Sequence, residues 1–266
     1  MIEHMDMREI PSSGIAFVLD ADNTLWDTDR VYRKAHLWLL AEIEREFRLT
    51  SAEIEDRLQF VRIIDQELAT KHHLGLRYPA RLLVKALATT LNGLDRASAI
   101  RSAIFEGIES DHYHFDYLAT EFDRKIREIP ELRDQVACTV EQLYNNKIPM
   151  VVATESSAQQ CSVILKKLGL EKFIDSVIAA PKSPELFLRI ANKLHLPGSS
   201  CFVVGDQLDR DIAPAMQIGF TGIYFPGGFS PNWTLSFKHV KPQYVISSFA
   251  EIPKIIETAS EIRLLS

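Results

Sequence analysis

Short apolar runs alternate along the chain with segments whose apolar positions recur at helical spacing. Most of the runs are apolar without alternation, as strands covered on both faces of a sheet must be. The expected strands lie at residues 14–20, 148–154, 176–180, 201–206, 222–225 and, more weakly, 244–246. Amphipathic segments separate them, and Gly169 is placed to end one of these helices. This order of strands and helices predicts an α/β protein with a parallel, doubly wound sheet.

The alternation stops between about residues 30 and 130, where no convincing strand interrupts a series of helical patterns. Helical spacing of apolar residues is found at 39–47, 54–68, 82–87 and 100–108. A further helix, expected at 133–146, returns the chain to the sheet. We therefore expect an all-helical domain of residues 28–131, inserted into a core of residues 1–27 and 132–266. An insertion of this size fits a small domain placed over the end of the sheet.

Composition and charge exclude some classes of partner. The 266 residues are 46% hydrophobic with a formal charge of −6, so the chain can bury a sizeable core and lacks the basic surface that nucleic acid requires. No apolar stretch approaches the roughly 18 residues of a membrane span, and the start lacks a signal peptide's apolar core. No membrane partner is therefore expected. Cys138, Cys161 and Cys201 form no CxxC pair and stand in apolar contexts, which predicts reduced core thiols in a cytoplasmic protein.

Polar side chains with complementary chemistry follow four of the expected strands. In order along the chain they are Asp20, Asp22, Thr154, Lys182, Asp206 and Asp211. Because ligands of open parallel sheets bind beyond the carboxyl ends of the strands, we expect these six residues to share one rim. Asp20 and Asp206 can supply the hard oxygen ligands that Mg²⁺ prefers, together with water and a substrate phosphate.

This set of residues suits phosphoryl transfer. Asp20 can attack phosphorus and form an aspartyl-phosphate, as carboxylate nucleophiles do in some ATPases. Asp22 is placed to protonate the leaving oxygen and later to activate water. Thr154 and Lys182 can bind the non-bridging oxygens, where charge develops in the transition state.

The same residues resemble the four motifs of the haloacid dehalogenase superfamily of hydrolases. The matching segments are DADNTL at residues 20–25, VVATES around Thr154, PKSPELF around Lys182 and VVGDQLDRDI around Asp206. The usual third motif has Pro directly after the Lys, where this chain has Ser183. The resemblance spans essentially the whole chain and implies a Rossmann-like core with a helical cap inserted after the first motif.

The resemblance also implies roles for single residues. Asp20 would be both nucleophile and metal ligand, Asp22 would be general acid and base with its backbone carbonyl on the metal, and Asp206 would ligate Mg²⁺. Asp211 would support the metal site, either directly or through water or Lys182. The dehalogenases of this superfamily do not retain the second Asp of the first motif. Asp22 therefore favours a phosphatase or a phosphomutase over carbon–halogen cleavage.

Three further residues are candidates for contact with substrate. Arg77 and Arg81 lie in HHLGLRYPAR, between two expected cap helices, where a loop could reach the substrate. Trp26 could line the entrance between core and cap, or anchor the hinge. The two glycines of the loop at residues 225–229 are interpreted as serving backbone conformation, without a phosphate role.

The sequence thus predicts a Mg²⁺-dependent phosphomonoester hydrolase that acts on a small phosphorylated metabolite through an aspartyl-phosphate. Nucleoside monophosphates, sugar phosphates and small phosphorylated acids all remain open as substrates, and the oligomeric state is open too. The alternatives are a phosphomutase of the same superfamily, a 2-haloacid dehalogenase and a catalytically idle binding protein.

Overall fold

The computed structural model describes residues 14–105, 113–229 and 239–264. The chain divides into two compact units. One, here called the core unit, comprises Met1–Asp29 and Ile129–Ser266, and the other, the helical unit, comprises Arg30–Glu128. None of the helices in the described ranges is both long and apolar enough to span a membrane.

The core unit contains a six-stranded parallel sheet with the strand order β3-β2-β1-β4-β5-β6. Each of the six apolar runs overlaps one strand, so the predicted fold class is confirmed. The strands are β1 Ala16–Leu19, β2 Met150–Thr154, β3 Ser176–Ala179, β4 Cys201–Gly205, β5 Thr221–Tyr224 and β6 Tyr244–Val245. Every residue of β1, β2 and β4 is buried, which is why these runs show no polar alternation.

Strand β1 is central and lies between β2 and β4. Phe17 pairs with Met150 on one side and with Phe202 on the other, and the rings of Phe17 and Phe202 stack with centroids 4.9 Å apart. The chain adds β2 and β3 on one side of β1 before it returns to add β4 on the other. The strand order therefore reverses between β1 and β4, the point at which open α/β sheets bind their ligands.

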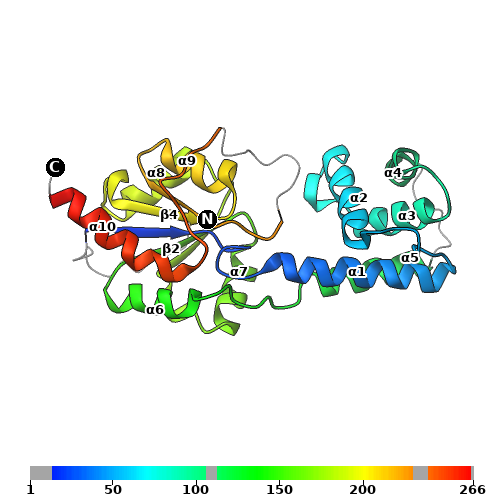
Figure 1. The fold of residues 1–266 in the computed structure, drawn as a ribbon, viewed down its shortest axis with the longest axis horizontal. Coiled ribbons are helices and arrows are strands. Elements are labelled where there is room, and N and C mark those ends of the chain that lie inside the picture. The colour runs from blue at the N-terminus through cyan, green and yellow to red at the C-terminus, as the bar shows by residue number, and fades with distance from the viewer. Residues whose placement is uncertain (1–13, 106–112, 230–238, 265–266) are drawn as a thin grey trace. The chain divides into compact units, whose positions relative to one another are not determined.

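Helices cover both faces of the sheet (Figure 1). Phe17 and Leu19 of β1 pack in one apolar cluster with α6, α7 and α10, whereas Ala16 and Val18 pack in another with α8 and α9. This alternation follows from the strand geometry, in which successive side chains point to opposite faces. The helices are α6 Val136–Asn145, α7 Ala158–Lys167, α8 Pro184–Lys193, α9 Ala213–Met216 and α10 Ile252–Leu264.

The helical unit contains no strand within its described residues. Its helices are α1 Thr28–Phe47, which starts in the core unit, α2 Arg57–Lys71, α3 Ala80–Leu91, α4 Arg96–Phe105 and α5 Tyr113–Lys125, with a short 3₁₀ turn at Gly75–Arg77. Their inner faces form one apolar cluster. The last residues of the helix expected at 100–108 lie outside the described ranges.

Two expectations are corrected by the fold. No helix was expected at α5, although its buried residues Phe115, Leu118, Ala119 and Phe122 have helical spacing. All three cysteines are free, but Cys138 is exposed, so the expectation of a core thiol is wrong there. Its helix α6 buries the neighbouring positions Val136, Thr139 and Val140 and turns Cys138 toward solvent.

Candidate active site

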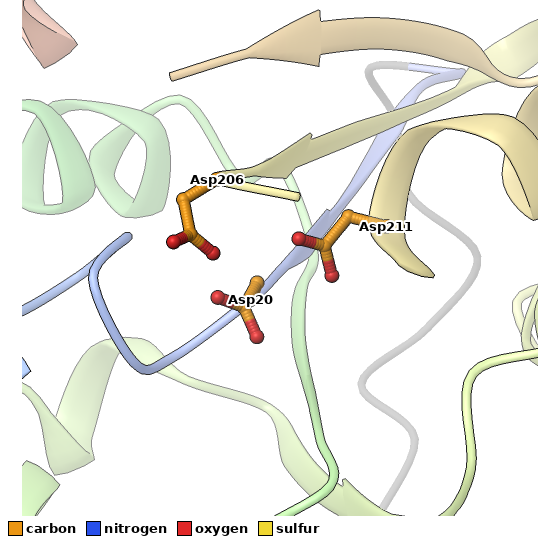
Figure 2. A group of neighbouring side chains, drawn as sticks. All are labelled: Asp20, Asp206 and Asp211. Atoms are coloured by element: carbon orange, nitrogen blue, oxygen red, sulfur yellow. The ribbon is translucent and has the colours of Figure 1, made fainter. Parts of the chain in front are cut away.

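Three buried aspartates meet at the switch point of the sheet. Asp20 follows β1, Asp206 follows β4, and Asp211 comes from the turn after Asp206. One carboxylate oxygen from each lies within 4.8 Å of the others, and Figure 2 shows the three carboxylates pointing toward one another. The backbone N–H of Asp20 donates to the carbonyl of Val204 at 2.9 Å, which ties the end of β1 to β4. The two central strands therefore place the carboxylates together.

Local sequence explains how Asp211 reaches this centre. It lies on a π-helical turn, Leu208–Ile212, whose last two residues donate their backbone N–H groups to the carbonyl of Gln207. The Gln207 backbone N–H donates to Asp211 Oδ2 at 2.9 Å, and the Asp211 N–H donates to the Gln207 carbonyl at 3.0 Å. A Cβ at Gly205 would lie 2.3 Å from the Cβ of Asp211, so no larger residue fits there without displacing that side chain.

Lys182 connects two of the three carboxylates. Its Nζ donates to Asp20 Oδ1 and to Asp211 Oδ1, and the lysine side chain is only 6% exposed. Burial by itself would lower the pKa of Lys182, but the charges of Asp20 and Asp211 outweigh it and hold the pKa above its ordinary value. The lysine is therefore charged and balances one of the three negative charges.

The remaining negative charge is costly to bury. Burial, opposed by Lys182 and reinforced by Asp211, raises the pKa of Asp20 from 3.8 to about 7. Burial, reinforced by the charges of Asp20 and Asp211, raises the pKa of Asp206 to about 9. Such shifts mark a site where a further positive charge would be stabilising. Because all the donors are carboxylate oxygens, the site fits a hard divalent cation.

The carboxylate of Asp22 is held by three donors of its own. It accepts hydrogen bonds from Trp26 Nε1 at 3.0 Å, Thr28 Oγ1 at 2.7 Å and Ser156 Oγ at 2.8 Å. The side chain of Asp22 is thus fixed beside the carboxylates of Asp20, Asp206 and Asp211, here called the acidic centre, without being one of them. Trp26 is 1% exposed, and its indole N–H is used to hold Asp22. A contact between Trp26 and substrate stays a prediction.

Thr154 ends β2 and is buried, and its hydroxyl oxygen accepts the backbone N–H of Ser156 at 3.0 Å. It does not cap the following helix, because the cap of α7 is Ser157, which accepts the N–H of Gln160 at 3.5 Å. Capping of α7 therefore does not explain why a residue with a hydroxyl group stands at position 154.

The departure from the usual third motif has a local explanation. Ser183, which stands where the family has Pro, is the cap of α8 and accepts the N–H of Leu186 at 3.4 Å. Pro184 then occupies the start of the helix, where its missing N–H costs nothing. Lys182 consequently keeps its place directly before α8.

Three residues near the site were not among the predicted ones. Glu155 accepts the backbone N–H of Lys182 at 3.1 Å and pairs through its other oxygen with Arg210. Arg133 donates to backbone carbonyls of the loops after β1 and β5. Gly227 packs against Asp206, since a Cβ there would lie 2.7 Å from Asp206 Oδ2. The sequence carries no local signal for the first two, because their partners are distant in the chain.

Gly227 also corrects an interpretation. The glycines at 227 and 228 were expected to serve backbone conformation, but neither has a positive φ. Gly227 is needed for close approach to Asp206 instead. The loop after β5 is therefore a wall of the acidic centre.

Arg77 and Arg81 belong to the helical unit. Arg77 ends the short 3₁₀ turn, and Arg81 near the start of α3 pairs with Asp116 of α5 at 2.7 Å. Their contact with substrate stays a prediction.

The comparisons with known proteins agree with this fold. A family model described as a haloacid dehalogenase-like hydrolase matches residues 16–219. A haloacid dehalogenase-like hydrolase from Xanthomonas campestris is similar in structure, with a TM-score of 0.61 at 17% identity over 92% of this chain and 96% of that one. No curated protein matches the chain in sequence.

Two more solved structures share the fold. A predicted phosphoglycolate phosphatase from Haemophilus somnus has a TM-score of 0.59 at 18% identity, over 92% of this chain and 98% of that one. YfnB of Bacillus subtilis, a candidate hydrolase of the same family solved with magnesium bound, has a TM-score of 0.58 at 16% identity, over 91% and 98%.

The fold and the site define an α/β protein with a carboxylate centre at the switch point of a parallel sheet. The chain belongs to the haloacid dehalogenase-like hydrolases.

Proposed function

We propose that the protein is a Mg²⁺-dependent phosphatase that hydrolyses a small phosphorylated metabolite. The observation that carries the proposal is the group of three buried carboxylates, two of them bonded to Lys182, with Asp22 fixed beside the group. A phosphate ester needs positive charge around its non-bridging oxygens, and a carboxylate centre supplies it only through a bound cation. Asp20, Asp206 and Asp211 would hold Mg²⁺, with the backbone carbonyl of Asp22, and the ion would offset the charge of the phosphoryl group and the carboxylates.

In the first step, a carboxylate oxygen of Asp20 attacks phosphorus and the bond from phosphorus to the ester oxygen breaks. The leaving oxygen takes a proton from Asp22. Thr154 and Lys182 bind the non-bridging oxygens and stabilise the charge that develops there in the transition state.

In the second step, water attacks the phosphorus of the aspartyl-phosphate and Asp22 accepts its proton. The bond between phosphorus and Asp20 breaks, which restores the enzyme and releases inorganic phosphate. The hydrogen bonds from Trp26, Thr28 and Ser156 support this role, because a general acid and base must keep one orientation through both steps.

The helical unit is proposed to act as a cap that excludes bulk water from the first step and selects the substrate. Arg77 and Arg81 are its candidate contacts to the substrate, and Trp26 is the candidate from the core unit.

The test is Mg²⁺-dependent phosphate release from an aryl phosphate and from a panel of phosphorylated metabolites, comparing Asp20→Asn with the wild-type protein. We expect Asp20→Asn to lose activity by about a thousandfold or more, because the nucleophile is removed. Asp209→Asn is the matched control, since Asp209 lies on the same turn as Asp211 and is not one of the three clustered carboxylates. Full activity of Asp20→Asn would refute the mechanism.

The same assays separate the alternatives. An isomerised sugar phosphate in place of free phosphate would indicate a phosphomutase. Chloride release from a 2-haloacid without a metal requirement would indicate a dehalogenase. Binding of ligands without any turnover would indicate an idle binding protein.

A further inference from the structure

Arg133 lies where the chain re-enters the core unit, shortly before α6. The segment that leaves the core unit and the segment that returns to it run side by side at this point. The backbone N–H of Asp27 donates to the carbonyl of Glu131 at 2.9 Å, and the N–H of Arg133 donates to the carbonyl of Leu25 at 3.1 Å. The backbone of Arg133 is therefore fixed to the segment that follows Asp22.

The guanidinium of Arg133 then joins two loops that are far apart in the sequence. Nη1 donates to the carbonyl of Asn23 and, at 3.2 Å, to that of Phe225, and Nη2 donates to the carbonyl of Pro226 at 2.8 Å. The guanidinium carbon also lies 3.3 Å from the centre of the Phe225 ring. A planar fork of donors that stacks on a ring can make this set of contacts, whereas a lysine ammonium cannot.

Both loops border the acidic centre. Asn23 directly follows Asp22 and adopts a left-handed conformation with φ of 58°, and its side-chain oxygen accepts the N–H of Asp29 at 2.7 Å. The second loop continues from Pro226 into Gly227, which packs against the carboxylate of Asp206. The guanidinium thus connects the backbone next to Asp22 with the loop that packs against the carboxylate of Asp206.

We propose that Arg133 is a positioning residue that clamps the loop after β1 to the loop after β5 and thereby holds Asp22 and Asp206 in place. Without the Arg133 guanidinium, the carbonyls of Asn23, Phe225 and Pro226 lose this hydrogen-bond donor. The loop after β5 is then no longer joined through Arg133 to the loop after β1. The effect on turnover rests on the proposed function, whereas the effect on cation binding requires only the three clustered carboxylates.

The test compares Arg133→Met, Arg133→Lys and Arg189→Met with the wild-type protein. Methionine keeps the apolar stem over Phe225 without the donors, and lysine keeps the charge without the fork. Arg189→Met is the matched control, because Arg189 is exposed on α8. For each variant, the Mg²⁺ half-saturation is read from the rise in melting temperature, kcat and KM from the aryl phosphate, and stability from urea unfolding.

We expect Arg133→Met to raise the Mg²⁺ half-saturation by about tenfold or more and to lower kcat by a similar factor, because outer residues that orient metal ligands have effects of this size. KM should change less than kcat, since no contact with substrate is removed. Arg133→Lys should behave like Arg133→Met, and Arg189→Met like the wild type.

The proposal is overturned if Arg133→Met only lowers stability and its folded fraction keeps the Mg²⁺ half-saturation and kcat of Arg189→Met. If Arg133→Met does not fold, a folded Arg133→Lys with wild-type Mg²⁺ half-saturation and kcat overturns the proposal equally. A wild-type protein that binds Mg²⁺ but does not hydrolyse phosphate esters would refute the proposed function, and the Mg²⁺ half-saturations would still decide the role of Arg133.

Discussion

Replacing Gly227 by alanine should disturb the acidic centre through one added methyl group. The new Cβ would lie 2.7 Å from Asp206 Oδ2 and 3.1 Å from the Cβ of Asn23, so a buried carboxylate or the loop must move. Overpacking of this kind costs about 1–3 kcal/mol. If the whole of this free energy is lost from Mg²⁺ binding, it corresponds to a loss of about 5- to 150-fold in Mg²⁺ affinity.

The neighbouring glycine provides the control. A Cβ at Gly228 would lie 3.3 Å from Asp29 Oδ2, a contact that a small adjustment can relieve, and neither glycine has a positive φ that an alanine would strain. Gly228→Ala should therefore keep its Mg²⁺ affinity within about threefold of the wild type. The assay is the Mg²⁺ dependence of the melting temperature, with Mg²⁺-dependent phosphate release as a second readout.

The result that would refute this reasoning is equal Mg²⁺ affinity in Gly227→Ala and Gly228→Ala. In that case the loop after β5 would yield without disturbing Asp206. A loss of melting temperature without a change in Mg²⁺ affinity would likewise show that the cost falls on stability alone.

Two further predictions concern pH. Burial raises the pKa of Asp20 to about 7 and the pKa of Asp206 to about 9, so the folded metal-free protein binds these protons more tightly than the unfolded chain. Their contribution to stability is present below about pH 4 and is lost as the pH rises through the folded-state pKa values of Asp20 and Asp206, by up to about 1.4 kcal/mol per pH unit for each carboxyl. Stabilisation by Mg²⁺ should accordingly be larger at pH 8.5 than at pH 6. Equal Mg²⁺-induced shifts in melting temperature at the two pH values would contradict this. Burial, opposed by Asp65 at 3.6 Å, lowers the pKa of His36, whose ring nitrogens have no hydrogen-bond partner among the described residues. Stability is then lost as the pH falls below about 6.5, the ordinary pKa of histidine. His36→Phe, which can still stack on Phe122, should reduce this loss when urea unfolding at pH 5 is compared with pH 7.5. An unchanged loss of stability at pH 5 in His36→Phe would contradict the prediction.

Much of the architecture is determined by the sequence itself. A strand buried on both faces must be apolar throughout, which made β1, β2 and β4 visible as short runs. The strands β3, β5 and β6 are not buried throughout, but their apolar runs also predicted them. Parallel strands end at one edge, so the acids after β1 and β4 were expected to converge, and the structure brings Asp20, Asp206 and Asp211 together. The pattern of α5 was equally present, but polar and aromatic residues among its apolar positions obscured it.

Other features were decided by the tertiary structure alone. Arg133 reaches carbonyls 92, 93 and 110 residues away, and backbone carbonyls carry no mark in a sequence. From the sequence, Gly227 was interpreted as serving the backbone conformation of its loop, whereas the structure places it in close approach to Asp206. Periodicity reports which side chains avoid water, and strand order reports which ends meet. Neither reports which distant groups touch, because that depends on how the loops pack once the sheet has formed.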